Sequence, residues 1–227
     1  VSDFDVDGKF NDAPATSVIS VEVNHSAYAW ATSPYRKFVI VKYDIKNTNA
    51  STLNNLYAGL LADWDITNAG QNKAAYDAAN KMGYVYMTGG GKYAAFKLLT
   101  GGGVTHYVVD NIAGGNGGVD PTAGGPPEFS SAEKYTVLST NRNADGFAAG
   151  GGDVMDCLSS GPFSITTGNS IIVAFAIIAG DNLADIQNSA CQAQAKWDNT
   201  GPCSTNAVND ITADNFWMDA YPNPAST

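Results

Sequence analysis

The first twelve residues contain acidic side chains with the spacing of a calcium-binding turn. The oxygen-bearing residues of this cluster are Asp3, Asp5, Asp7, Asn11 and Asp12. Alternate aspartates followed by Gly8 predict carboxylate oxygens around one point, as in the first half of an EF-hand loop. The twelfth loop position is Pro14 instead of a bidentate glutamate. We therefore expect a looser calcium site of extracellular type, and the alternative is an acidic strand edge in solvent.

A second acidic pair flanks a tryptophan in the sequence Asp63-Trp64-Asp65. On a strand, residues i and i+2 share one face about 7 Å apart, so both carboxylates are predicted to lie opposite an inward Trp64. The pair either binds one cation, with Asn72 and Asp77 folded over it, or accepts hydrogen bonds from the following loop. Of the two clusters, the N-terminal one has the more specific pattern, and we expect calcium there first.

The residues that enzymes use for nucleophilic catalysis lack a recognisable arrangement. The chain has two histidines, His25 and His106, and no nucleophile elbow, H-E-x-x-H helix or P-loop. Both histidines are expected at the surface or at strand ends. We predict a non-catalytic chain. The enzymatic alternative is a cleft with two carboxylates, which has no local sequence signature.

Aromatic residues make up 11% of the chain and indicate a second binding chemistry. Exposed rings on a sheet face can stack on sugars, whereas rings on strands commonly form cross-strand pairs or core contacts. The residues in question are Tyr28, Trp30, Tyr35, Tyr57, Tyr84, Tyr86 and Tyr93.

Charge excludes two classes of partner. The chain has 22 acidic residues against 12 Lys and Arg, a net charge of −10, and no basic cluster. Binding to nucleic acid requires clustered Lys and Arg to neutralise phosphates, so neither nucleic acid nor an anionic membrane is expected as a partner. The longest apolar run, residues 171–179, is too short to span a bilayer.

The three cysteines allow one disulfide, whose formation the sequence does not settle. Cys191 and Cys203 flank the turn-forming pair Gly201-Pro202 and can close a small disulfide loop, although spacing alone does not settle the bridge. Cys157 is then expected to be a small buried apolar residue.

A period of two dominates the chain and predicts β-strands. Residues 38–45 and 56–66 alternate in this way across a polar turn at 47–55, which predicts a hairpin or meander. Residues 170–178 are apolar on both faces and indicate a central strand. The other expected strands are 17–23, 83–87, 93–99, 106–109, 135–140 and 164–166. Short strands with glycine-rich connections predict an all-β fold, a two-sheet antiparallel sandwich of jelly-roll type.

One helix is predicted near residues 182–197, capped by Asp181 or Asn182. Its apolar residues recur at helical spacing: Leu183, Ile186, Ala190, Ala193 and Trp197. A shorter helix is expected near residues 72–81.

Two segments bear a resemblance to known families. The end of the chain, Tyr221-Pro-Asn-Pro-Ala-Ser-Thr227, is similar to the opening of the C-terminal sorting domain of the type IX secretion system of Bacteroidota. Residues 38–47 (FVIVKYDIKN), 56–66 (LYAGLLADWDI) and 173–176 (VAFA) resemble a β-rich region that follows the catalytic domain of secreted subtilisin-like (S8) peptidases of these bacteria. Further matches are Ala74-Ala-Tyr-Asp77, Ala132-Glu-Lys-Tyr135, Gly161-Pro162 and Gly180-Asp181.

The resemblance implies a domain organisation and a role. We expect an accessory β-sandwich at 1–205, a linker at 206–220 and the start of the sorting domain at 221–227. Because the chain opens on Val1 without a signal peptide, we expect it to be a piece of a larger protein. The implied role is that of a secreted or cell-surface accessory domain of a hydrolase, a protease first of all. Its partners would be the parent's catalytic domain, the type IX machinery, and a protein or polysaccharide substrate. The alternative is a carbohydrate-binding module of a secreted glycoside hydrolase.

Overall fold

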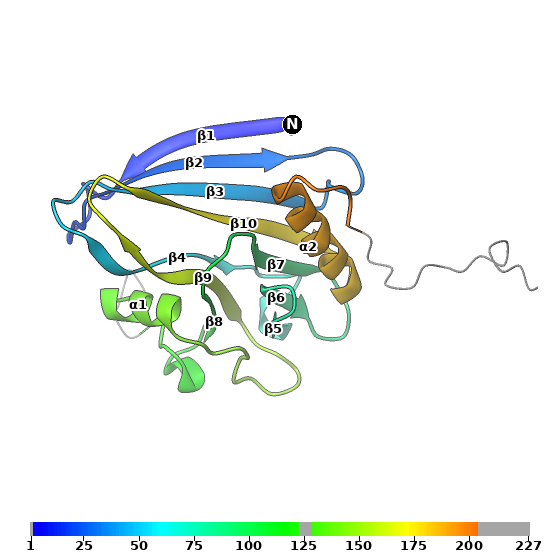
Figure 1. The fold of residues 1–227 in the computed structure, drawn as a ribbon. Helices are drawn as coiled ribbons and strands as arrows, with labels where there is room; N and C mark the ends of the chain where they lie inside the picture. Colours follow the sequence, from blue (N-terminus) through cyan, green and yellow to red (C-terminus); the bar gives the residue numbers. More distant parts are fainter. Residues whose placement is uncertain (1, 123–128, 204–227) are drawn as a thin grey trace, which may run out of the picture.

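The computed structural model describes residues 2–122 and 129–203 (Figure 1). The expected linker at 206–220 and the sorting motif at 221–227 lie outside the described residues. In chain order the elements are β1 (Phe4–Asn11), β2 (Val21–Ala29), β3 (Phe38–Asn47), β4 (Leu53–Asp63), the 3-10 turn η1 (Ala69–Gln71), β5 (Asn72–Asp77), β6 (Met82–Met87), β7 (Tyr93–Leu98), β8 (Val104–Asp110), the 3-10 turn η2 (Gly115–Gly117), α1 (Ser131–Ser139), β9 (Val154–Ile165), β10 (Ser170–Gly180) and α2 (Leu183–Trp197).

The strands form two antiparallel sheets, which confirms the predicted all-β sandwich. The larger sheet has seven strands in the order β1-β2-β3-β10-β7-β6-β5, and the smaller has three in the order β4-β9-β8. In Figure 1 the smaller sheet lies below β10. The predicted central strand is confirmed, because β10 lies between β3 and β7 and pairs with both.

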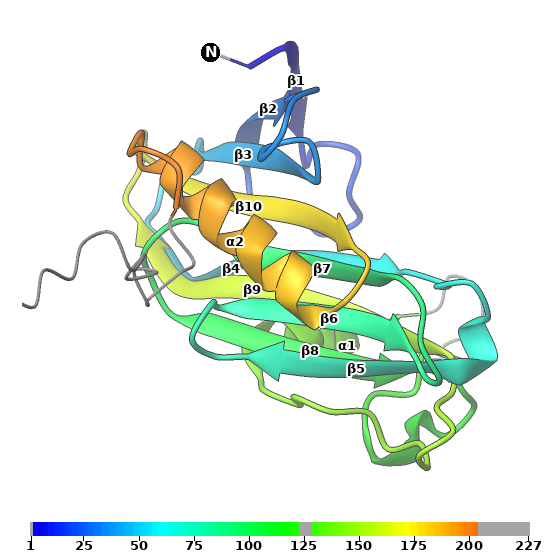
Figure 2. The ribbon, with the colours of Figure 1, turned by 90° about the vertical axis from the view of Figure 1, so that its right-hand side faces the viewer.

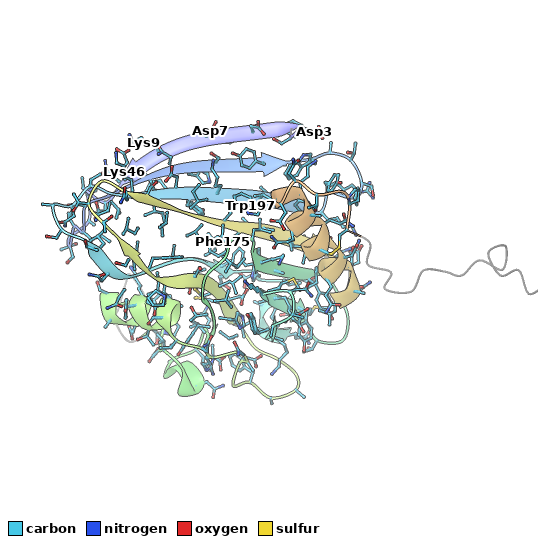
Figure 3. All side chains as sticks on the ribbon, in the orientation of Figure 1. Asp3, Asp7, Lys9, Lys46, Phe175 and Trp197 are labelled. Atoms are coloured by element: carbon cyan, nitrogen blue, oxygen red, sulfur yellow. A yellow bond between two sulfur atoms is a disulfide. The ribbon has the colours of Figure 1, made fainter. Side chains whose placement is uncertain are left out.

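The main core fills the space between the two sheets. Phe175 of β10 is buried there and is labelled between the sheets in Figure 3. Leu158 and Ile165 of β9 face it from the smaller sheet. Side chains alternate across a pleated strand, so one row of each strand enters this core. Its other buried members are Val23, Val41, Ile45, Phe96, Leu98 and Val173.

Helix α2 covers the opposite face of the larger sheet, as Figure 2 shows. The predicted cap is confirmed at Asn182, whose side chain accepts a hydrogen bond of 3.0 Å from the Asp185 amide. Ile186, Ala190 and Ala193 are fully buried against the sheet. The two alanines allow the helix to approach closely, and burial of this stripe stabilises the helix more than its intrinsic propensity does. No helix in the described part of the chain is long and apolar enough to cross a membrane.

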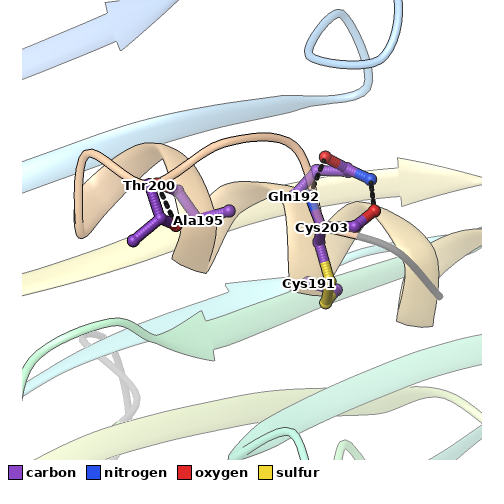
Figure 4. Close-up of a disulfide and its surroundings, with 5 residues drawn as sticks. All are labelled: Cys191, Gln192, Ala195, Thr200 and Cys203. Carbon is purple, nitrogen blue, oxygen red and sulfur yellow. Dashed lines mark hydrogen bonds between the residues drawn. A yellow bond between two sulfur atoms is a disulfide. The ribbon is translucent and has the colours of Figure 1, made fainter. Parts of the chain in front are cut away.

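A disulfide ties the segment after α2 to the helix (Figure 4). The bridge joins Cys191 and Cys203, with a Cα–Cα distance of 5.7 Å. Gln192 exchanges two hydrogen bonds with the backbone of Cys203, at 2.7 and 3.0 Å. Cys157 is buried and unbridged in β9, as predicted, and burial raises the pKa of its thiol far above the ordinary value.

Two predicted elements have the wrong secondary structure. Residues 135–140 were expected as a strand but belong to α1, because Ser130 and Glu133 form a capping box that begins a helix at Ser131. Residues 72–81 were expected as a helix but contain β5, whose residues pair with β6 along its full length. Pairing with a neighbouring strand overrides local propensity.

The predicted hairpin or meander, in which residues 38–45 pair with 56–66, is also wrong. Strand β3 pairs with β2 and β10, whereas β4 pairs with β9 in the other sheet. Asn47 holds the corner between them. It is fully buried, and its side-chain amide donates to the carbonyls of Ser51, at 2.9 Å, and Ile165, at 2.7 Å. These bonds direct the chain from one sheet to the other.

The boundaries of the remaining strands differ only in part. The strand expected at 17–23 begins at Val21 and runs on to Ala29, and the short strand at 164–166 is the end of the longer β9.

Candidate functional site

One end of the smaller sheet brings together residues from three strands. Strand β4 ends at Asp63, which lies opposite Met155 of β9. Strand β8 ends at Asp110, which lies opposite Val154 at the start of β9. Because β9 is antiparallel to both neighbours, the residues after β4, before β9 and after β8 meet at the same end. The residues in these positions are mostly acids and amides.

Asp63, Asp65 and Asp153 form the acidic triad at this end. One oxygen of each carboxylate lies within 4.8 Å of the others. The Asn111 side-chain amide lies 3.1 Å from Asp153 Oδ2 and 3.4 Å from Asp63 Oδ2. The second oxygen of Asp153, Oδ1, is buried and accepts no hydrogen bond from the described residues. The triad therefore offers unused oxygen acceptors.

The turn after β4 places Asp65 beside Asp63. Asp65 adopts a left-handed conformation with φ of 43°, so the strand alternation assumed in the prediction ends at Asp63. The buried side chain of Asn72 holds this turn: its Oδ1 accepts from the Ile66 amide at 2.8 Å, and its Nδ2 donates to the Ile66 carbonyl at 2.9 Å. The polar atoms of the Asn72 side chain are thus engaged by the backbone of the turn that carries Asp65.

The expected cover from Asp77 is wrong. Its carboxylate accepts hydrogen bonds from Asn80 and Gln187, at 2.7 and 2.9 Å, on the side of the sheet that carries α2. Asp153, which replaces it as the third carboxylate, has no local motif and was not predicted.

The triad carries uncompensated negative charge. Partial burial, and then the nearby charges of Asp153 and Asp65, raise the pKa of Asp63 to about 6. None of the ion pairs found among the described residues includes a member of the triad. Unpaired carboxylates this close repel one another, and a bound cation would remove that repulsion.

The predicted N-terminal cluster has a different geometry. Gly8 lies inside β1 and pairs with His25, so the predicted turn there is wrong. Asp5 and Asp7 occupy alternate positions of β1 and Asp3 directly precedes the strand, so the three side chains are spread along it and do not converge on a point.

The N-terminal aspartates have local hydrogen bonds instead. Asp3 accepts one from the Ala31 amide at 2.8 Å, and Asp5 accepts one from the Ser2 hydroxyl.

Asp12 closes the loop between β1 and β2. Its carboxylate accepts hydrogen bonds from the amides of Ile19, Ser20 and Val21, at 2.6, 2.9 and 3.0 Å. Desolvation alone would raise the pKa of Asp12, but these hydrogen bonds lower it overall. The residue therefore stays ionised and organises the loop.

His106 is fully buried inside β8, so its expected position at the surface or at a strand end is wrong. Its Nε2 lies 2.6 Å from Asp156 Oδ1, and its Nδ1 lies 3.1 Å from Asn143 Oδ1. The ring also stacks on Tyr76, with centroids 5.1 Å apart. Gly83 provides the space for the ring, because a Cβ there would lie 2.5 Å from His106 Cδ2. This contact set indicates a packed structural residue.

An ion pair with a fully buried carboxylate also joins β8 to a loop and carries no sequence signal. Arg142 contacts both oxygens of the fully buried Asp110, at 3.1 and 3.2 Å. The Gly146 amide and the Asn116 side chain each donate to Asp110 at 2.8 Å. Each of these hydrogen bonds comes from a residue outside the strands and holds a loop in place, so the pair has a structural role.

The aromatic residues form clusters on the larger sheet. Tyr84, Tyr86 and Tyr93 stack on one another across β6 and β7, and the rings of Tyr86 and Tyr93 are nearly parallel at 5.3 Å. All three are half-buried. Part of the surface of each ring is therefore in contact with the neighbouring rings.

An apolar groove of about 410 Å³ runs between the inner face of β1–β3 and strand β4. Phe10, Val23 and Ile45 line it from the larger sheet, and Leu56 and Leu60 line it from β4. No carboxylate belongs to its lining, so this groove does not supply the acid pair that the enzymatic alternative requires.

The sequence matches no protein-family model, and no match to a curated protein was found.

Proposed function

We propose that this chain is a calcium-stabilised, non-catalytic accessory domain of a secreted or cell-surface bacterial hydrolase, a protease first of all, exported by type IX secretion. The observation that supports the calcium site is the grouping of Asp63, Asp65 and Asp153, with a buried oxygen of Asp153 that accepts no hydrogen bond from the described residues. Such a site gives a sandwich a way to remain folded outside the cell.

The chemistry of the triad suits calcium. Calcium takes six to eight oxygen ligands at roughly 2.3–2.6 Å in flexible geometry. Three carboxylates and the side-chain carbonyl of Asn111 offer oxygens, and water would complete the shell. Asn111 now donates its amide to Asp63 and Asp153; a half-turn of this amide would present its oxygen to a cation.

The expected stabilisation follows from mass action. Extracellular calcium modules bind with Kd of about 0.1–1 mM. With a Kd of about 1 mM, 10 mM calcium stabilises the fold by about 1.4 kcal/mol. For a chain of this size, that free energy raises Tm by roughly 3–6 °C.

Thermal unfolding with three variants tests the calcium site. Tm is measured in 10 mM CaCl₂, in 10 mM MgCl₂ and in excess chelator. We expect the calcium shift in the wild type, its loss in Asp153→Asn, and its retention in Asp198→Asn, which neutralises an exposed aspartate after α2. Retention in Asp5→Asn/Asp7→Asn would separate the triad from the N-terminal strand. An equal shift in Asp153→Asn and the wild type would refute the site.

The accessory role is tested by the gene that encodes the chain. The sequence resemblance to the region after S8 catalytic domains supports the role, and the geometry of His106, held by Asp156 and Asn143, supports a structural histidine. We expect a subtilisin-like catalytic domain in the reading frame before residue 1 and the rest of a sorting domain after residue 227. A signal peptide directly before Val1 would refute the accessory role.

Carbohydrate binding is a second candidate, supported by the cluster of Tyr84, Tyr86 and Tyr93. Retention of the protein on insoluble polysaccharides, lost in Tyr86→Ala and kept in Tyr28→Ala, would favour it. No retention on any glycan would exclude it.

A further inference from the structure

Strand β1 presents one long backbone edge that no strand among residues 2–122 and 129–203 covers. It is the last strand of the seven-stranded sheet and pairs with β2 on one side only. All eight of its residues, Phe4–Asn11, are exposed. In Figures 1 and 2 it forms the outer margin of the molecule. Free amide and carbonyl groups along such an edge can accept a further strand.

One face of β1 is apolar and uncovered. Phe4, Val6 and Phe10 are 65%, 62% and 54% exposed. They lie opposite Ala29, Ala27 and Val23 of β2, of which Ala27 and Val23 belong to the core between the sheets. The smaller sheet ends at β4 and leaves the groove at this point, with Phe10 in its wall. The inner face of the larger sheet therefore extends beyond the smaller sheet that covers the rest of it.

The other face of β1 is acidic. Asp5 and Asp7 lie on it and Asp3 directly precedes the strand, and Figure 3 shows Asp3 and Asp7 at the margin of the sheet. Lys9, the basic residue of the strand, is engaged by Glu22 at 2.8 Å. In the part of the chain that the structure describes, no ion pair neutralises these three aspartates. The edge thus combines an apolar row with a row of negative charge.

A second copy of the chain is a poor match for this edge. Antiparallel pairing of two β1 strands about Asp7 sets Asp7 against its own copy, and pairing about Val6 sets Asp5 against Asp7. Pairing about Gly8 sets Asp7 against Lys9, which Glu22 already engages. Like charges directly opposite each other on neighbouring strands are destabilising. The net charge of −10 adds long-range repulsion between copies. The charge of the edge selects a partner of opposite sign.

We propose that β1 is a docking edge for an extended segment of another polypeptide with alternating apolar and basic side chains. Main-chain hydrogen bonds add this segment to the sheet beside β1. Its apolar side chains cover Phe4, Val6 and Phe10 on one face, and its Lys or Arg side chains lie opposite Asp3, Asp5 and Asp7 on the other. This inference goes beyond the proposed calcium-stabilised role and does not depend on it.

Binding of synthetic peptides tests the proposal. The probe is a fluorescently labelled KVKFKVK peptide, followed by anisotropy at low and high salt. One control has the same composition in blocks, KKKKVFV, and the other is the acidic EVEFEVE. We expect only the alternating basic peptide to bind, with an affinity that falls as salt rises. Equal binding of the block peptide would refute strand addition, and so would absence of binding.

Variants and hydrogen exchange locate the binding. Asp5→Asn/Asp7→Asn is expected to weaken binding about five-fold, from two lost cross-strand charge pairs. The matched control, Asp181→Asn/Asp198→Asn, changes net charge equally near α2 and should leave the affinity unchanged. Backbone amides of β1 should gain protection from exchange with the peptide bound. Equal weakening by both variants, protection elsewhere, or a dimer of the free protein that Val6→Lys dissociates would each overturn the proposal.

Discussion

Gly83→Ala is expected to destabilise the fold strongly, although alanine is the smallest addition to a strand. A Cβ at this position would lie 2.5 Å from His106 Cδ2, 2.7 Å from His106 Nε2 and 2.9 Å from Asp156 Oδ1. Neither neighbour can move freely, because both are fully buried. Tyr76 stacks on the imidazole ring and further restricts it.

The magnitude follows from the contacts that must give way. Overpacking a dense core costs about 1–3 kcal/mol, and weakening the hydrogen bond between His106 and Asp156 adds about 1.5–3 kcal/mol. Alanine lowers the conformational entropy of the unfolded chain, and this offsets about 0.4–1 kcal/mol of the loss in stability. We expect a net loss of about 1.5–5.5 kcal/mol and a fall in Tm of roughly 3–20 °C.

Chemical denaturation and thermal melts measure this loss against a matched control. Gly8→Ala places the same methyl group in a strand where the nearest atom, His25 Nδ1, is 3.8 Å away, and should change stability by less than about 0.5 kcal/mol. In a double-mutant cycle, His106→Ala should remove most of the cost of Gly83→Ala, since the clash disappears with the ring. A Gly83→Ala protein as stable as the wild type, or strictly additive costs, would refute the reasoning.

Three further predictions concern other parts of the fold. Burial lowers the pKa of Lys97 from 10.5 to about 8, so the unfolded chain binds more protons between these values. The free energy of unfolding should therefore rise with pH across that window, by up to about 3 kcal/mol; urea melts of Lys97→Met that retain the rise would contradict this. Removing the disulfide with Cys191→Ala/Cys203→Ala should cost about 3 kcal/mol through the closed loop, and a reductant should destabilise the wild type but not the variant. Ser130→Ala should lower the free energy of unfolding by about 1 kcal/mol, because it removes the capping box that Ser130 forms with Glu133. Equal midpoints of denaturation for the variant and the wild type would disprove this.

Local sequence patterns determined much of the fold. Apolar alternation identified β3 and most of β4, because a strand with one buried face must place its apolar residues at a period of two, and a run that is apolar on both faces identified β10. The cap at Asn182 and the apolar stripe from Ile186 to Ala193 identified α2 for the same kind of reason, since both signals lie within the helix itself. Composition and alternation together were sufficient for the class of fold.

Local patterns gave the wrong structure where the conformation of a segment depends on residues far away in the sequence. Residues 72–77 have helical propensity, yet pairing with β6 makes them a strand. The corner at Asn47 depends on a hydrogen bond to Ile165, which lies far along the chain. Neither partner is visible from the segment that it controls.

For the same reason, only part of the candidate site could be predicted from the sequence. Asp63 and Asp65 are neighbours in the sequence, and their types alone indicated cation chemistry. Asp153 joins them because β9 runs antiparallel to β4, and His106 meets Asp156 because β8 runs antiparallel to β9. Strand pairing brings distant residues to within a few ångströms, and the choice of pairing is made by the free energy of the whole sandwich. Residue types therefore indicated the chemistry, while the tertiary structure decided which residues share it.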